Sequence, residues 1–171
     1  MARNILHCDM NNFYASVECM LNPALKEYPV AVCGSVEERH GIVLAKNYKA
    51  KAFDVKTGDT VWQAQQKCRD LVIVPPHYDS KLARSVYERY TDQVEPYGMD
   101  ECWLDITGTG SLFGSPVEVA NKIRETIKFE LGLTISVGVS FNKIFAKLGS
   151  DMKKPDAVTV IPNPHPGKEQ R

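Results

Sequence analysis

VEPYGMDECWLDI, residues 94–106, holds two short apolar segments on either side of Gly98 and two adjacent acids, Asp100 and Glu101. Both segments have the length and composition of β-strands, so we predict a hairpin that turns at Gly98. Neighbouring side chains on a regular strand point to opposite faces, and the two acids can therefore share a site only at a bend or a strand end. A turn at Gly98 would provide that bend.

A third acid, Asp9, follows the apolar run Asn4-Ile5-Leu6-His7-Cys8, which is predicted to be a mostly buried strand. Two strands from distant parts of the chain could bring Asp9 to Asp100 and Glu101. Three clustered carboxylates cannot all stay ionised at neutral pH without a compensating cation. A pair of divalent ions would supply that charge, and such pairs serve phosphoryl and nucleotidyl transfer. The alternative is that Asp9 is a turn residue or a helix cap, and the sequence leaves both interpretations open.

The composition indicates an ordinary globular protein. The chain has 171 residues, of which 43% are hydrophobic, enough for one domain or a domain with a subdomain. No apolar run approaches membrane-spanning length, and the N-terminus lacks the apolar stretch of a signal peptide. The five cysteines are scattered without C-x-x-C spacing, which indicates reduced core residues. We therefore expect a cytoplasmic protein with no membrane partner.

The charge is balanced overall but unevenly placed. The formal net charge is zero, which argues against a self-sufficient nucleic-acid binder. In residues 41–58 four lysines oppose one aspartate, and the same holds in residues 142–154. Two basic segments and an acidic cluster suit a site that holds metal ions and a polyphosphate together. Each basic segment taken alone is equally consistent with a solvated helix face.

Hydrophobic periodicity predicts helices and strands in mixed order, with Asn12, Thr60 and Ser115 as helix caps. Because an adjacent-strand hairpin lies in the middle with helices around it, an α+β domain is favoured over a doubly wound one. The predicted helices cover residues 13–21, 47–53, 60–68, 79–92, 115–131 and 142–152, and the predicted strands cover 4–8, 28–34, 41–45, 71–74, 94–97, 102–106, 133–139 and 157–161.

Four segments, in order along the chain, resemble the motifs of the Y-family translesion DNA polymerases, of the bacterial DNA polymerase IV type. They are HCDMNNFYASVE at 7–18, NYKAKAFDV at 47–55, MDECWLD at 99–105, and LGLT, SVGVSFNK, AK and DMKKP between 131 and 155. Each motif alone is moderately specific, and all four in order are strongly specific.

The resemblance implies an α+β fold with two parts. One is a polymerase palm, a mixed or antiparallel sheet with helices packed on it, made from residues 1–11 and 75–161. The other is a small α/β fingers subdomain at residues 12–74. Residues 162–171 are proline-rich and would be a linker toward a thumb, which in the family follows the palm together with a further DNA-gripping domain.

The resemblance also implies a metal site. Two Mg²⁺ ions would be held by Asp9, Asp100, Glu101 and the main-chain carbonyl of Met10, since Mg²⁺ prefers oxygen ligands. Asp105 is expected to be structural, and Trp103 is expected to lie in the core.

A nucleotide site is implied beside the metals. Tyr48, Lys51 and Lys154 would grip the phosphates, together with main-chain N–H groups near Asn12 and Phe13. Tyr14 would be the steric gate, with its ring against the sugar C2′ so that a ribose 2′-hydroxyl has no room. On a continuous helix, Lys143, Lys147 and Lys154 would share one face. By position alone, Tyr14 could be an ordinary half-buried aromatic, and Tyr48 and Lys51 a solvated helix face.

The implied activity is that of a DNA-directed DNA polymerase acting in translesion synthesis and DNA repair. Its partners would be primer–template DNA, a deoxynucleoside triphosphate and a sliding clamp bound through further segments. The alternatives are a non-catalytic polymerase-like module that binds nucleotide or DNA, and another two-metal palm enzyme such as a nucleotide cyclase. Lys51 stands where the family usually has arginine, which would loosen the phosphate grip. Between Tyr78 and Leu82 the chain is more than one helical turn shorter than the family pattern.

Overall fold

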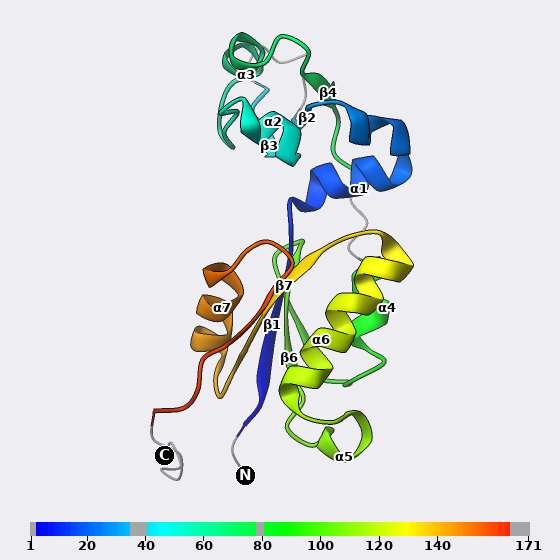
Figure 1. Ribbon diagram of the computed structural model, residues 1–171, viewed down its shortest axis with the longest axis vertical. Coiled ribbons are helices and arrows are strands. Elements are labelled where there is room, and N and C mark those ends of the chain that lie inside the picture. The colour runs from blue at the N-terminus through cyan, green and yellow to red at the C-terminus, as the bar shows by residue number, and fades with distance from the viewer. Residues whose placement is uncertain (1–2, 35–40, 78–80, 165–171) are drawn as a thin grey trace. The chain divides into compact units, whose positions relative to one another are not determined.

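The structure, a computed structural model, describes residues 3–34, 41–77 and 81–164. The chain divides into two compact units. The first comprises Met1–Asn11 and Ser80–Arg171, and the second comprises Asn12–Asp79. Both contain a β-sheet with helices, so the predicted α+β class is confirmed (Figure 1). Residues 78–80, where the chain is shorter than the family pattern, and the end of the predicted linker lie outside the described residues.

The first unit is built on a five-stranded sheet in the order β5-β6-β1-β7-β8. Neighbouring strands are antiparallel except β7 and β8, which are parallel, so the sheet is mixed. All six residues of the central strand β1 are buried, as expected for a strand with neighbours on both sides and helices on both faces. The strands are β1 (Ile5–Met10), β5 (Val94–Tyr97), β6 (Glu101–Asp105), β7 (Ile135–Ser140) and β8 (Val158–Val160).

Helices cover both faces of this sheet: α7 lies on one side, and α4 and α6 lie on the other (Figure 1). The predicted cap of α6 is confirmed, because the Ser115 hydroxyl accepts from the Glu118 N–H while the Glu118 carboxylate accepts from the Ser115 N–H. The helices are α4 (Lys81–Tyr87), α5 (Gly110–Phe113), α6 (Pro116–Thr126) and α7 (Lys143–Met152), with a π-helical turn at Ile127–Leu131.

Two helices of this unit end earlier than predicted. The helix predicted to reach residue 92 ends at Tyr87, because the N–H groups of Arg89 and Tyr90 bond three residues back and the chain tightens into turns. The α-helical part of the segment predicted to reach residue 131 ends at Thr126, and the π-helical turn that follows stops at Gly132, whose φ is 66°. The short helix α5 was not predicted.

The close packing of α7 on the sheet depends on Gly138 in β7. A Cβ at this position would lie 1.8 Å from the Ala146 carbonyl oxygen and 2.5 Å from the Ser150 nitrogen. Both atoms belong to the backbone of α7, so any side chain would push the helix away from the sheet. Gly138 is also the residue of β7 paired with His7 of β1, and it therefore sets how near α7 lies to the centre of the sheet.

The second unit holds a three-stranded sheet in the order β3-β2-β4, with β2 antiparallel to β3 and parallel to β4. Its core consists of small and aliphatic residues: Ala31, Cys33, Val43, Ala50, Val55, Ala64, Cys68 and Leu71. The elements are α1 (Phe13–Leu21), a 3-10 helix (Pro23–Glu27) that was not predicted, β2 (Val30–Cys33), β3 (Val43–Lys46), α2 (Tyr48–Ala52), α3 (Val61–Lys67) and β4 (Val72–Val74).

The predicted caps of this unit have different outcomes. Thr60 caps α3 in a capping box with Gln63, as predicted. The prediction that Asn12 caps α1 is wrong: Asn12 precedes the helix, but its backbone is left-handed, with φ 49°, and its side chain makes no capping hydrogen bond. The helix predicted to begin at Asn47 begins at Tyr48. Asn47 is its N-cap residue, and the Asn47 side-chain oxygen accepts from the Ala50 N–H at 2.9 Å.

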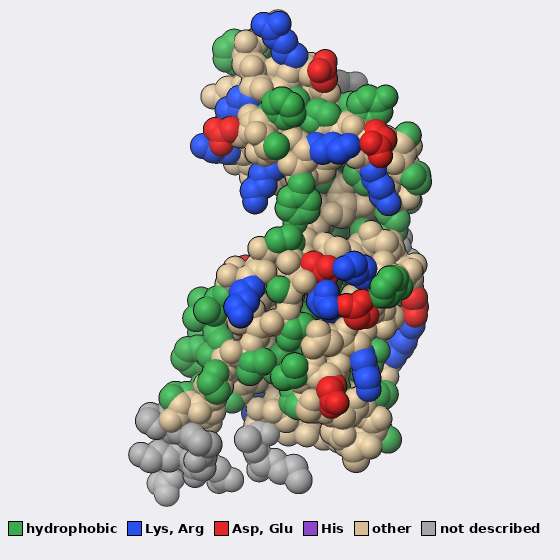
Figure 2. All heavy atoms as spheres, in the orientation of Figure 1, with side chains coloured by type: hydrophobic (Ala, Val, Ile, Leu, Met, Phe, Trp, Pro, Cys, Tyr) green, Lys and Arg blue, Asp and Glu red, His purple; other side chains and the backbone are tan. Residues whose placement is uncertain are grey.

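Hydrophobic side chains gather on the outer surface of α7 (Figure 2). Ile144, Leu148 and Met152 are four residues apart and therefore line one stripe of the helix, with exposed fractions of 78%, 52% and 61%. Among the described residues, no helix is both long and apolar enough to cross a membrane.

Candidate active site

The centre of the first unit brings two of the predicted acids together. In the register of β1 and β6, Asp9 is paired with Glu101, and the Met10 N–H donates to the Asp100 carbonyl at 3.0 Å. Asp100 belongs to the turn that follows Gly98, whose φ is 75°. Glu101 therefore lies opposite Asp9 at a strand end, and Asp100 precedes it in the turn, which is the location that the sequence required for the adjacent acids.

The side chains of Asp9 and Glu101 interact directly, and each also has a lysine partner. Lys154 Nζ lies 2.6 Å from Asp9 Oδ2, and Lys147 Nζ lies 2.6 Å from Glu101 Oε1. Asp151 extends the network, with its Oδ1 at 2.8 Å from Lys154 Nζ. Within the part of the chain that the structure describes, no three His, Cys, Asp or Glu side chains are grouped as metal ligands.

Burial and mutual repulsion shift the protonation of the acids. Burial raises the pKa of Asp9, Lys154 lowers it and the nearby Glu101 raises it, and the net value is about 6. Burial likewise raises the pKa of Asp100, with the Glu101 charge adding to the effect. Burial also acts to raise the pKa of Glu101, but the Lys147 ammonium outweighs it and the net pKa is lowered. Two acids in contact, one easily protonated and one held ionised, form a site that attracts cations.

The three lysines predicted to share a helix face do not do so. The helix α7 ends at Met152, so Lys154 reaches Asp9 from the turn beyond it. Lys143 extends elsewhere and pairs with Glu95. Lys147, which the sequence predicted to share a helix face with Lys143 and Lys154, is the residue of α7 whose ammonium group contacts Glu101.

His7 lies beneath the acids and holds α7 against β1. Its Nδ1 is 2.8 Å from Ser150 Oγ, and that hydroxyl donates to the Lys147 carbonyl at 2.7 Å, so Nδ1 is the donor. Burial, with the Lys147 charge, lowers the pKa of His7 to about 4, so the ring is neutral at pH 7. Sequence patterns indicated only that His7 belongs to a buried strand.

The predicted nucleotide-binding residues Asn12, Phe13, Tyr14, Tyr48 and Lys51 belong to the second unit. Phe13 is buried at the start of α1, and its ring packs against the half-buried Tyr14 with centroids 5.2 Å apart. Tyr48 and Lys51 lie three residues apart in α2 with exposed side chains, the arrangement that their spacing predicts. The sixth predicted residue, Lys154, belongs to the first unit.

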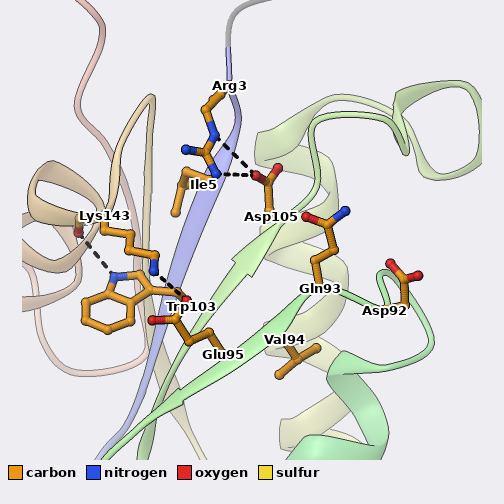
Figure 3. Close-up of a pocket in the computed structure, with 9 residues that line it drawn as sticks. All are labelled: Arg3, Ile5, Asp92, Gln93, Val94, Glu95, Trp103, Asp105 and Lys143. Atoms are coloured by element: carbon orange, nitrogen blue, oxygen red, sulfur yellow. Dashed lines mark hydrogen bonds and ion pairs between the residues drawn. The ribbon is translucent and has the colours of Figure 1, made fainter. Parts of the chain in front are cut away.

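A separate pocket of about 300 Å³ opens over the strands β1, β5 and β6 (Figure 3). Trp103 lines it, so the expectation that this side chain lies in the core is wrong: it is half-buried, and its Nε1 donates to the Lys143 carbonyl at 3.2 Å. Asp105 also lines it and is structural, as expected, because it accepts from Arg3 at 2.8 Å and from the Thr107 N–H at 3.0 Å. None of the predicted site residues lines this pocket.

Comparisons with known proteins agree with the geometry. Residues 8–151 match the model of the impB/mucB/samB family. The chain is 64% identical over 166 residues to DNA polymerase IV of Acetivibrio thermocellus, covering 94% of this chain and 42% of that protein. It is 44% identical to DNA polymerase IV 1 of Bacillus subtilis, covering 94% of this chain and 40% of that protein.

Solved structures show the same fold. DinB from Sulfolobus solfataricus is 32% identical, with a TM-score of 0.85 over 93% of this chain and 48% of that one. An insertion ternary complex of Dbh DNA polymerase is also 32% identical, with a TM-score of 0.85 over 94% of this chain and 49% of that one. The chain thus spans less than half the length of these relatives. The resemblance found in its motifs is confirmed, and the chain belongs to the impB/mucB/samB family, the Y-family of DNA polymerases.

Proposed function

We propose that the intact gene product that contains this chain is a DNA polymerase that transfers deoxynucleotides to a primer 3′-hydroxyl, directed by a template, in translesion synthesis and DNA repair. The observation that carries the proposal is the contact between Asp9 and Glu101 at the end of two central strands, with Asp100 beside them and a lysine on each contacting acid. The names of the relatives, DNA polymerase IV, support it. The first unit would be the palm and the second unit the fingers.

The acids suit Mg²⁺, because every donor that they offer is an oxygen. The two lysine ammonium groups lie within hydrogen-bond distance of the carboxylates, and these contacts support a site that accepts positive charge. The ligands would be Asp9, Asp100, Glu101 and the main-chain carbonyl of Met10. Two bound Mg²⁺ ions would supply the charge that activates the primer hydroxyl and neutralises the leaving pyrophosphate.

The chain's own groups would bind and orient the nucleotide. Lys154 would exchange its contact with Asp9 for the triphosphate, and Tyr48 and Lys51 would add contacts to the same phosphates. The N–H groups at the start of α1, near Asn12 and Phe13, would face the phosphates as helix N-termini do. Tyr14, beside Phe13 in α1, would exclude a ribose 2′-hydroxyl by steric contact.

The partners would be primer–template DNA and a deoxynucleoside triphosphate. The related Dbh structure, described as an insertion ternary complex, supports this. A sliding clamp as recruiting partner and a cytoplasmic location remain predictions from the sequence.

Primer extension by the intact gene product tests the proposal. Asp100→Ala and Asp9→Ala should each abolish extension with Mg²⁺, because the remaining acids cannot hold the metal charge. Glu130→Gln is the matched control. It removes an acid of the same unit that forms an exposed ion pair with Arg89 and has no part in the proposed metal site. Wild-type protein that binds nucleotide or DNA but extends no primer would favour the non-catalytic module, and product formed without DNA would favour a cyclase.

A further inference from the structure

The turn that carries Lys154 is held in place by a set of contacts to its neighbour Asp156. Lys154 lies beyond the last residue of α7, Met152, so the helix does not hold its backbone, although its ammonium group lies 2.8 Å from Oδ1 of Asp151 in α7. Asp156 is in the left-handed region, with φ 53°, a conformation that is uncommon for residues other than glycine.

The carboxylate of Asp156 is clamped by two cations from the α6 region. Arg124 donates from a guanidinium nitrogen to Asp156 Oδ1 at 2.8 Å, and Lys128 Nζ lies 2.7 Å from Asp156 Oδ2. The side chains of Arg124 and Asp156 are only 18% and 22% exposed, so this pair is screened less than a surface ion pair. The Asp156 carboxylate is thus paired with Arg124 and Lys128, whereas the Lys154 ammonium group pairs with Asp9 and Asp151.

The backbone of Asp156 is tied to the end of β1. The Asp156 N–H donates to Asn11 Oδ1 at 2.9 Å. The Asn11 side-chain amide in turn donates from Nδ2 to Ser136 Oγ at 2.9 Å. Asn11 is 5% exposed, and its own N–H donates to the Thr134 carbonyl at 2.9 Å. The backbone and the side chain of Asn11 are therefore both held by β7 and the segment before it, and the Asn11 side chain fixes the position of the turn through the Asp156 N–H.

These contacts fix both Asp9 and the turn that carries Lys154 to the end of β1. Asp9 is at the end of β1, and Asn11 follows it after one intervening residue. Because Asn11 binds the backbone of Asp156, the turn 153–156 is placed relative to the acid that Lys154 contacts. Lys154 Nζ accordingly lies 2.6 Å from Asp9 Oδ2, although the two residues are far apart in the chain.

We propose that Asn11 and Asp156 are positioning residues, which hold the turn 153–156 so that the Lys154 ammonium lies over Asp9 and can receive the phosphates of a nucleoside triphosphate. This inference rests on the proposed function, which gives Lys154 its role as a phosphate ligand. Asn11 and Asp156 act through Lys154 and do not themselves contact the nucleotide.

A double-mutant cycle tests it in the intact gene product. The affinity for a deoxynucleoside triphosphate analogue with a non-hydrolysable α,β-bridge is measured at equilibrium for Asn11→Ala, Lys154→Ala and the double variant. Asn11→Ala should weaken binding by about fivefold, the effect expected when the hydrogen bond that holds the Asp156 N–H is lost. In the Lys154→Ala background the same change should have no further effect, because the lysine that it positions is gone. In steady-state extension, Asn11→Ala should raise KM for the nucleotide more than it lowers kcat.

Two further variants separate positioning from general damage. Asn11→Asp keeps the acceptor for the Asp156 N–H and should restore most of the affinity. Arg124→Met removes one clamp of Asp156 and should weaken binding, whereas Arg89→Met breaks an exposed ion pair with Glu130 in the same unit and should not. If Asn11→Ala does not fold, the nucleotide affinities of Arg124→Met and Arg89→Met are compared with and without Lys154→Ala. A loss of affinity in Arg124→Met that disappears in the Lys154→Ala background supports the positioning role, and any other result overturns it.

The outcomes distinguish the two proposals. If Lys154→Ala weakens binding and Asn11→Ala weakens it by the same factor with or without Lys154, the positioning role is overturned and the proposed function stands. An absence of any effect of Asn11→Ala and Arg124→Met would overturn it in the same way. If Lys154→Ala leaves the affinity unchanged, the phosphate role of Lys154 in the proposed function fails, and the inference falls with it.

Discussion

Asp9 and Glu101 lie opposite each other on neighbouring antiparallel strands, and their carboxyl groups interact even though each is also bound to a lysine. Like charges at a paired position normally destabilise a sheet. Here the cost is offset by Lys154 and Lys147, which reach the acids from the turn after α7 and from α7 itself. The cations that balance the pair are therefore supplied by a segment that is remote in sequence.

The stability of the protein should depend on the protonation of Asp9. Burial raises its pKa from 3.8 to about 6, so the folded state binds a proton that the unfolded state has released. The stabilisation from this proton is complete below the unfolded value and is lost as the pH rises through the folded value. In metal-free buffer, the unfolding free energy of wild type minus that of Asp9→Asn should fall between pH 4 and pH 6. A flat difference in denaturant titrations across this range would contradict the shift.

Tyr14→Ala should relax discrimination against ribonucleotides. Removing the ring opens the space that we assign to the sugar 2′-hydroxyl, so the ratio of deoxyribonucleotide to ribonucleotide incorporation should fall by about tenfold or more, which is about 1.4 kcal/mol. Single-nucleotide insertion kinetics measure that ratio. Tyr28→Ala removes an exposed tyrosine of the same unit and should leave the ratio at its wild-type value. An unchanged ratio in Tyr14→Ala would remove the gate role.

Gly138→Ala should destabilise the first unit. The new Cβ would lie 1.8 Å from the Ala146 carbonyl oxygen, so α7 must move away from the sheet, at a cost of about 3 kcal/mol. The movement should also weaken the contacts of Lys147 with Glu101. Urea unfolding measures the loss, and Gly108→Ala is its control, because a Cβ there meets nothing within 4 Å. Equal stability of the two variants would show that the approach of α7 is not limited by Gly138.

Ser115→Ala should cost about 1 kcal/mol of unfolding free energy, because the N-terminus of α6 loses its capping hydroxyl. The Ser115 Oγ accepts from the Glu118 N–H at 3.4 Å, and the N–H would be left to solvent. Thermal unfolding of Ser115→Ala against Ser111→Ala, which changes an exposed serine in α5, measures the effect. If both variants melt together, the capping box contributes nothing to the stability of this helix.

Much of the site was predictable from local patterns. The apolar run before Asp9, the turn at Gly98 and the adjacent acids after it indicated two strand ends carrying carboxylates, and the strands are found there. The motif order gave the family. Local patterns failed where long-range packing decides the outcome: α7 ends before Lys154, Trp103 lines a pocket, and Asn12 adopts a left-handed backbone without capping α1.

The sequence by itself determined most of the helices and strands, the place of the three acids at or beside strand ends, and the family to which the chain belongs, because these depend on periodicity and on residue types at fixed spacing. Only the tertiary structure decided which side chains meet: that Asp9 pairs with Glu101, that Lys147 and Lys154 are the cations that balance them, and that Asn11 holds the turn bearing Lys154 through Asp156. The physical reason is that strand register and the close approach of α7 at Gly138 arise from packing between residues far apart in the chain, which no local pattern records.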